Sequence, residues 1–162
     1  MTDVASFADI AQEFEQRVRR IVWCTVTTVD GKGRPRARIL HPMWEGSTGW
    51  IATGRDSFKA KHIKKNPYVS LSYWDQQHQQ IYVECTAAWE DDAAERERVW
   101  NLFKNTPPPY GYDPGMFWQG GSTDPSFGAL KLTPWRIELY SLQDVMQGKG
   151  PQVWRPQLAA SR

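Results

Sequence analysis

Between two apolar strand patterns, this chain carries the segment Thr53-Gly-Arg-Asp-Ser-Phe-Lys-Ala-Lys-His-Ile-Lys-Lys-Asn-Pro-Tyr68. Its middle predicts a short lysine-rich helix that Asp56 or Ser57 can cap. The Asn-Pro pair then ends the helix, because the residue before a proline is disfavoured in the α region. Free N–H groups at the helix start, together with Ser57, Lys59 and Lys61, would form a cradle for a phosphate. The alternative is a solvated basic helix that binds nothing.

The flanking patterns predict a mainly β chain with few helices. Strand patterns lie at 21–28, 36–41, 49–53, 68–74, 80–89 and 128–142, and helix patterns at 5–20 and 91–105. Pro134 is expected to break the last strand, because proline cannot donate to a ladder. Strands this close together predict an antiparallel barrel with peripheral helices. We expect one domain over 1–162, with an N-terminal helix (1–20), the barrel (21–142) and a C-terminal tail (143–162).

A possible capping box is predicted at the start of the first helix, where Ser6 is followed by Asp9. In the strand at 36–41, alternation places Arg36 and Arg38 on one face. Two neighbouring arginines repel each other unless an anion or a carboxylate lies between them. The sequence therefore leaves two explanations open for Arg38, an anion site and a surface salt bridge.

Composition limits the classes of function. The net charge of +2 gives no general case for binding nucleic acid. Cys24 and Cys85 lie inside strand patterns without metal-ligand spacing, so we expect buried thiols in a reducing compartment. No apolar run approaches the roughly 20 residues that span a bilayer, and no signal peptide is visible. We expect a cytoplasmic protein without a membrane partner.

A long connection over 107–123 is rich in proline, glycine and aromatic residues. Connections of this length are usually disordered or functional. The aromatic residues favour an ordered flap, with Tyr110 to Trp118 as a candidate lid over a substrate. The three histidines have no ligand spacing, so we predict neither a metal site nor a catalytic triad, and no catalytic residue is assigned. His41 could face a bound ring, or it could simply end its strand.

Four blocks of this sequence resemble the pyridoxamine 5′-phosphate oxidase-like family of flavin-binding split β-barrels. Arg38-Ile-Leu40 corresponds to the family's Arg-x-Val-Leu, and the segment from Ser57 to Pro67 corresponds to Ser-Arg-Lys-x-x-x-Leu-x-x-Asn-Pro. Gln80-Ile-Tyr-Val-Glu84 corresponds to Gln-Val-Arg-Ile-Glu. Phe127-Gly128 and Ile137-Glu-Leu-Tyr140 correspond to the family's C-terminal strand. The resemblance covers roughly residues 20 to 142. No single block is specific, but the four occur in the family's order and spacing.

The resemblance implies a six-stranded antiparallel split barrel and a homodimer with two cofactor sites at the subunit interface. By this analogy Arg38, Ser57 and Lys59 hold the cofactor phosphate. The strand residues Ile51, Ala52 and Thr53 line the edge of the ring, and Gln80 of the other chain bonds the cofactor. A flavin or deazaflavin oxidoreductase follows, with FMN or coenzyme F420 as cofactor and an unidentified small-molecule substrate.

Departures from the family pattern limit the assignment. Phe58 replaces an arginine of the phosphate motif, and Phe127 replaces a tryptophan. The tail carries Val153-Trp154-Arg155 where the oxidase has an Arg-x-His pair that grips pyridoxamine phosphate. We therefore expect little pyridoxamine phosphate oxidation, and an aromatic at 154 would suit a flatter substrate. The alternatives are a cofactor carrier or sensor without turnover and a haem-binding protein with His41 as the only candidate ligand.

Overall fold

A computed structural model describes residues 1–156 of the chain. Its strands are β1 (Thr2–Val4), β2 (Cys24–Val29), β3 (Pro35–Leu40), β4 (Met43–Glu45), β5 (Thr48–Gly54), β6 (Tyr68–Trp74), β7 (Gln79–Glu90), β8 (Phe127–Ser141) and β9 (Gln152–Trp154). Its α-helices are α1 (Ala8–Ile21), α2 (Phe58–Lys65), α3 (Ala93–Asn105) and α4 (Leu142–Met146). Two 3-10 turns, Pro114–Met116 and Gly121–Thr123, lie in the connection before β8.

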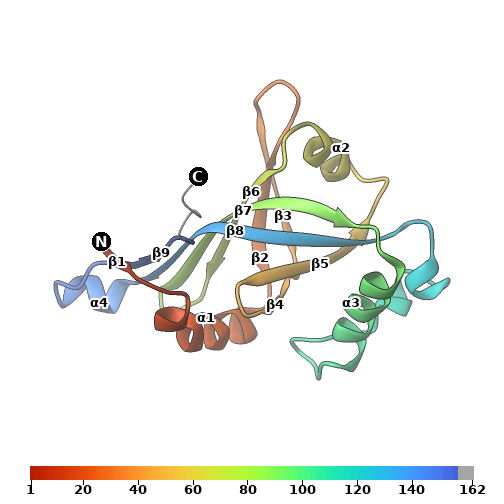
Figure 1. Ribbon diagram of the computed structural model, residues 1–162. Helices are drawn as coiled ribbons and strands as arrows, with labels where there is room; N and C mark the ends of the chain where they lie inside the picture. The colour runs from red at the N-terminus through yellow and green to blue at the C-terminus, as the bar shows by residue number, and fades with distance from the viewer. Residues whose placement is uncertain (157–162) are drawn as a thin grey trace, which may run out of the picture.

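The six longer strands form the predicted antiparallel split barrel, which confirms the fold class. The hydrogen-bonded order runs β1-β9-β8-β7-β6-β2-β3, and β5 joins through β8 while pairing with β4 on its other side. Within the described residues β3 has β2 as its one hydrogen-bonded neighbour. Figure 1 shows the β2–β3 hairpin rising beside α2, away from α1 and α3.

Helix α1 packs against the barrel through one apolar face. Ile10, Phe14 and Val18 are each at most 1% exposed and join a core with strand residues such as Tyr73 and Trp44. The predicted capping box at the start of α1 is only half formed. The backbone N–H of Ser6 donates to the Asp9 carboxylate at 2.8 Å, but the residue at the N-cap is Phe7, whose side chain makes no capping bond.

Helix α3 covers a second core beside β5 and β8. Asp92 caps it by accepting the Glu95 N–H at 2.9 Å. Its buried face, which includes Trp100 and Phe103, packs against apolar residues such as Trp50. No helix within residues 1–156 is both long enough and apolar enough to cross a membrane.

Strand β8 continues through Pro134, so the predicted break is wrong. The strand pairs with β7 from Ala129 to Ser141, and the register shifts once, between Glu84 and Cys85 of β7. Pro134 lies opposite Cys85, at this irregularity. A proline is tolerated where the ladder is already disrupted, because the missing N–H then leaves no regular bond unmade.

The three short strands β1, β4 and β9 were not predicted from the sequence, because each has only three residues. Strand β1 pairs with β9 in parallel, and β9 pairs with β8, so the two ends of the chain meet at one edge of the sheet (Figure 1). This pairing places Trp154 against Phe7, with ring centroids 5.3 Å apart. Trp154 is only 9% exposed and belongs to the main core, so the expectation that it contacts a flat substrate is wrong.

Both cysteines are free thiols buried in strands, as predicted. Burial raises the pKa of Cys24 to about 12, although a hydrogen bond with Tyr73 opposes the change. Burial also raises the pKa of Cys85. Neither thiol is therefore a nucleophile at neutral pH, because the thiolate is the reactive form.

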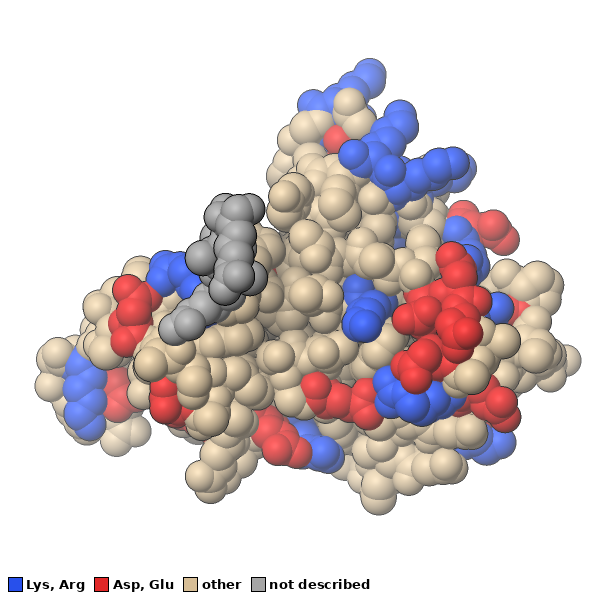
Figure 2. All heavy atoms as spheres, viewed as in Figure 1, with Lys and Arg blue, Asp and Glu red and all other residues tan. Residues whose placement is uncertain are grey.

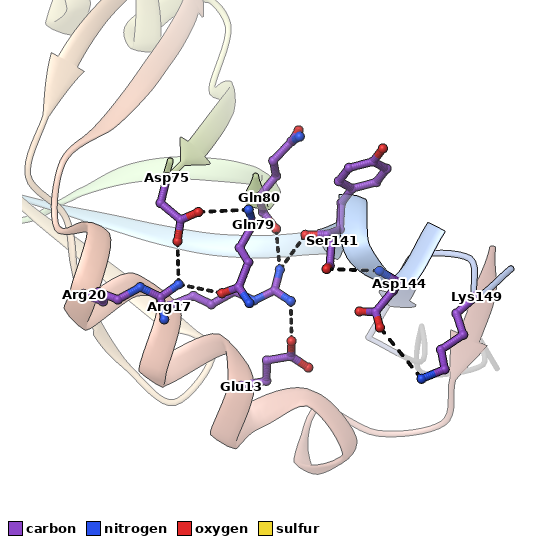
Figure 3. Close-up of polar contacts among 10 residues, drawn as sticks. Glu13, Arg17, Arg20, Asp75, Gln79, Gln80, Ser141, Asp144 and Lys149 are labelled. Atoms are coloured by element: carbon purple, nitrogen blue, oxygen red, sulfur yellow. Dashed lines mark hydrogen bonds and ion pairs between the residues drawn. The ribbon is translucent and has the colours of Figure 1, made fainter. Parts of the chain in front are cut away.

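Arg17 fastens α1 to the sheet. Its Nη1 atom donates to the carbonyl oxygens of Gln80 at 2.9 Å and Tyr140 at 2.7 Å, and its Nη2 atom donates to Glu13. Figure 3 shows the guanidinium between α1 and the ends of β7 and β8. The residue is 2% exposed, so these bonds are made away from water and replace the hydration that the charge has lost.

We expect Arg17→Met to lower the free energy of unfolding by about 2 kcal/mol, because the carbonyl oxygens of Gln80 and Tyr140 lose a buried donor. Arg19→Met is the matched control, since Arg19 makes the same kind of i,i+4 pair with Glu15 on the exposed side of α1. That loss should stay below about 1 kcal/mol. Urea unfolding of both variants measures the difference, and equal losses would show that Arg17 does not hold the helix.

Candidate functional site

A cluster of basic side chains lies where β3 meets the start of α2. Figure 2 shows Lys and Arg gathered on this part of the surface, over the hairpin and α2. In the ladder Arg38 lies opposite Val26, and Arg36 opposite Thr28, so both arginines share the face of two buried β2 residues. The prediction that they lie on one face is confirmed.

Arg38 is held in place by a buried polar chain. Its Nη1 atom donates to the hydroxyl of Thr28 at 2.9 Å and to the carbonyl of Val26 at 3.3 Å. The Thr28 hydroxyl in turn bonds Nδ1 of His62 at 2.9 Å. Thr28 and His62 are 1% and 8% exposed, so they fix the guanidinium from inside the barrel.

The sequence reading missed this supporting pair. A polar Thr28 at an inward position of β2, and a histidine on the buried side of α2, were the available signals. Each is ordinary alone, and only the packing of α2 on β2 brings them together. The salt-bridge explanation for Arg38 is not supported, because Arg38 forms no ion pair with a carboxylate within residues 1–156.

Lys59 stands close to Arg38. Burial lowers the pKa of Lys59, and the positive charge of Arg38 lowers it further. Burial likewise lowers the pKa of Arg38, with the charge of Arg36 as the second cause. In the part of the chain that the structure describes, Arg36, Arg38 and Lys59 have no carboxylate partner. Three neighbouring cations without a counter-charge would attract a polyvalent anion.

Ser57 caps α2, as the sequence predicts. It has an extended backbone, and its Oγ atom accepts the N–H of Ala60 at 3.4 Å. The first helical bonds are those from Ala60 and Lys61 to the Ser57 carbonyl. Within residues 1–156 the N–H groups of Phe58 and Lys59 have no partner. They are therefore available to an anion at this end of the helix.

An apolar cavity of about 400 Å³ adjoins the basic cluster. It is lined by Trp23, Ile39, Leu40, His41, Ile51, Ala52, Thr53, Gly54, Tyr112, Met116, Phe117 and Trp118. β3 runs from Arg38 directly into this wall, and β5 leaves the same wall toward Ser57 and Lys59. The two strands thus connect a cationic end to an apolar end, which suits a flat ring carrying a phosphate. Trp23, which is 58% exposed, was not among the predicted site residues.

The connection between α3 and β8 is ordered, as expected, and forms part of the cavity wall. Tyr110 fixes it, since its hydroxyl accepts the backbone N–H of Trp44 at 2.7 Å and its carbonyl oxygen lies 2.7 Å from Nε2 of His41. Met116 and Phe117 are 76% and 67% exposed beyond this anchor. Closure of this segment over a substrate remains a prediction.

The His41 side chain therefore has a defined hydrogen-bond partner, the carbonyl oxygen of Tyr110. A carbonyl oxygen can only accept, so the Nε2 atom of His41 carries a proton. Burial lowers the pKa of His41, and the hydrogen bond to Tyr110 opposes that change. The neutral ring with its proton on Nε2 is the form present at neutral pH. Residues 1–156 contain no group of three His, Cys, Asp or Glu side chains arranged to hold a metal.

Gln80 lies apart from the other predicted site residues. Arg38, Val26, Leu71 and Val83 are directly opposite one another across four strands, so their side chains share a face. Gln80 is three positions from Val83 and points to the other face. Its Oε1 atom accepts the Tyr82 hydroxyl. The contact of Gln80 with a cofactor of the other chain stays a prediction.

Several known proteins are similar to this chain in sequence. Residues 10–141 match the protein family described as pyridoxamine 5′-phosphate oxidase. A pyridoxine/pyridoxamine 5′-phosphate oxidase of Paraburkholderia phytofirmans is 39% identical over 75 residues, which make up 43% of this chain and 35% of that protein. A Paraburkholderia xenovorans enzyme of the same name is 39% identical over 62 residues, or 37% of this chain and 29% of that protein. The match thus spans about a third of the length of these curated relatives.

Solved structures show the same fold. A Clostridium acetobutylicum protein related to general stress protein 26 superposes with a TM-score of 0.71 at 18% identity, covering 94% of this chain and 97% of its own. A pyridoxamine 5′-phosphate oxidase-related, FMN-binding protein of Nostoc punctiforme gives a TM-score of 0.61 at 17% identity, with 86% of each chain covered. The resemblance read from the sequence is confirmed for the family and for the split barrel.

The buried imidazole of His41 should make stability depend on pH. The unfolded chain binds a proton on this histidine near pH 6.5, whereas the folded chain binds it only at lower pH. The free energy of unfolding should therefore fall as the pH drops below about 6.5, by up to about 1.4 kcal/mol per pH unit for one proton, until the folded form also protonates.

His41→Gln is the variant that checks this effect, because the glutamine amide can still donate a hydrogen bond but does not titrate. Urea unfolding of both proteins between pH 7.5 and 5 gives the comparison. We expect the wild-type protein to lose more stability over this range than the variant does. Identical pH profiles would mean that His41 is not protonated preferentially in the unfolded state.

Proposed function

The chain belongs to the pyridoxamine 5′-phosphate oxidase family, and on this premise we propose that it is a flavin- or deazaflavin-dependent oxidoreductase. The cofactor would be FMN or coenzyme F420, both of which join a flat ring to a phosphate. The observation that carries the proposal is the continuity between the basic cluster and the apolar cavity.

The residues fit such a cofactor by charge and by shape. Arg38, Lys59 and the free N–H groups of α2 would hold the phosphate through charge-assisted hydrogen bonds. Ser57 would contribute its hydroxyl from the helix cap. The backbone of β5 over Ile51, Ala52 and Thr53 would lie along the ring, as the resemblance implies.

When bound, the cofactor would supply hydride transfer to and from a substrate stacked on its ring. This chain's residues would bind and orient both molecules. Thr28 and His62 keep Arg38 aimed, so that little entropy is lost when the phosphate arrives. The wall formed by Tyr112, Phe117 and Trp118 would exclude water from the ring. Such a wall suits an apolar, planar substrate better than a charged one.

Pyridoxamine phosphate is not the substrate we favour. In this chain Trp154 is buried in the core, and Arg155 pairs with Asp3 at the surface. The described tail thus offers no uncommitted charged group with which to grip a second phosphate.

A carrier or sensor without turnover is the second candidate, because binding requires the same contacts as catalysis. The haem alternative is weaker. Its one candidate ligand, His41, already uses Nε2 in a bond with the Tyr110 carbonyl, which leaves only Nδ1 for iron.

We further propose a homodimer with two shared cofactor sites, acting on a small molecule in the cytoplasm. Gln80 would serve the site of the partner chain, which agrees with its position on the opposite face of the sheet. Sedimentation velocity at micromolar concentration should give about twice the mass of 18.7 kDa. A monomer that still binds cofactor tightly would contradict the shared site.

Titration with FMN tests the phosphate position. We expect Lys59→Ala to raise the dissociation constant about ten- to a hundredfold, because one charge-assisted contact is lost. Lys64→Ala is the matched control, since Lys64 has the same charge but lies on the exposed side at the end of α2. Equal effects of the two variants would place the phosphate elsewhere.

Turnover is a separate measurement. FMN-loaded protein is reduced anaerobically by dithionite and then mixed with a quinone acceptor, while the flavin spectrum is recorded. Rapid return of the oxidised spectrum is expected of an oxidoreductase. Tight binding with no reoxidation by any acceptor in a panel would instead support the carrier, and F420 is tested in the same way.

A further inference from the structure

Phe58 is an exposed aromatic residue inside the basic cluster. It is the first residue of α2, and 68% of it is exposed. Two cations lie over its ring, Arg36 from β3 and Lys61 from the next turn of α2, each 5.5 Å from the ring centroid. A side chain this exposed contributes little to the core, so its neighbours give the better clue to its purpose.

Arg36 has no carboxylate partner among residues 1–156. Its guanidinium is held instead by the Phe58 ring, an interaction that orders an otherwise flexible side chain. Arg36 and Arg38 are two positions apart on one face of β3, which places their Cα atoms about 7 Å apart. The positive charge of Arg36 reaches Arg38, whose pKa it lowers.

We propose that Arg36 is a third cationic ligand of the cofactor phosphate and that Phe58 is the positioning residue that holds it there. The inference rests on the proposed function, because it takes the phosphate site at Arg38 and Lys59 as its starting point. Arg36 would approach the phosphate from the β3 side, while Lys59 and the N–H groups of α2 approach from the helix.

This arrangement accounts for the residue at position 58. The family pattern has an arginine between Ser57 and Lys59, and this chain has a phenylalanine there. An arginine on the neighbouring strand, stacked on that phenylalanine, restores a guanidinium to the same place. Phe58 thus replaces a direct contact with an indirect one.

Lys61 is the less suitable ligand, although it lies at the same distance from the Phe58 ring. It lines a separate groove on the other side of α2 with Arg55 and Trp89. Arg36 shares the face of Arg38 and also has the planar fork of donors that matches phosphate oxygens.

Parallel titrations with FMN and riboflavin isolate the phosphate, because riboflavin has the same ring without it. Arg36→Ala should raise the dissociation constant of FMN about ten- to a hundredfold and change that of riboflavin by less than about twofold. Arg34→Ala is the matched control, since Arg34 lies on the same hairpin but pairs with Asp30 at 2.7 Å. It should leave both constants unchanged.

Variants at position 58 test the positioning. Phe58→Leu keeps an apolar side chain but removes the aromatic face, and should weaken FMN binding about two- to fivefold. Phe58→Trp should bind as the wild type does. The double variant Arg36→Ala with Phe58→Arg should recover most of the affinity lost in Arg36→Ala, because the guanidinium returns from the helix side. Phe58→Leu should change the dissociation constant little in the Arg36→Ala background, because Phe58 acts through Arg36, whereas a merely structural role of Phe58 would weaken binding in both backgrounds.

Failure of the proposed function and failure of this inference give different results. If Lys59→Ala loses the preference for FMN over riboflavin while Arg36→Ala behaves like Arg34→Ala, the assignment of Arg36 is overturned and the proposed function stands. If Phe58→Leu weakens FMN binding as much in the Arg36→Ala background as in the wild type, the positioning by Phe58 is overturned. If the wild-type protein binds riboflavin as tightly as FMN, both the phosphate site and this inference are wrong.

Discussion

Strand β8 is the constraint on which the other elements depend. It pairs with β7 from Ala129 to Ser141, with β5 over its first half, and with β9 over part of its second half. The change of partner falls around Pro134, where the missing N–H and the shifted register interrupt the regular ladder. The first half thereby fixes β5, and with it the start of α2, while the second half fixes the two ends of the chain.

Electrostatic repulsion among three neighbouring cations determines which kind of ligand the candidate site favours. Folding brings Arg36, Arg38 and Lys59 together, and the burial that lowers the pKa values of Arg38 and Lys59 is a cost that no carboxylate among residues 1–156 offsets. Surfaces that serve only solubility can separate like charges at no cost. A cluster held together by Thr28, His62 and an aromatic ring instead favours a partner with several negative charges.

The apolar half of the site is built differently, because a long connection completes the wall that β3 and β5 begin. Its rigidity comes from buried contacts of Tyr110, whose hydroxyl and carbonyl are both bonded. Outside this anchor Met116 and Phe117 are largely exposed, so they can adjust to a substrate without disturbing the barrel. This division separates a fixed cationic end from an adaptable apolar end.

The sequence by itself determined the strand periodicities, the cap at the start of α2, and the position of Arg36 and Arg38 on one face of their strand. Each of these depends on neighbours within a few residues. The four spaced blocks also identified the family. Only the tertiary structure decided that Thr28 and His62 support Arg38, that Trp154 belongs to the core, and that Phe58 lies beneath Arg36. Apart from the bond between Thr28 and Arg38, these contacts join residues more than 20 positions apart. No local pattern records them, since they arise when α2, β2, β3, β1 and β9 pack on one barrel.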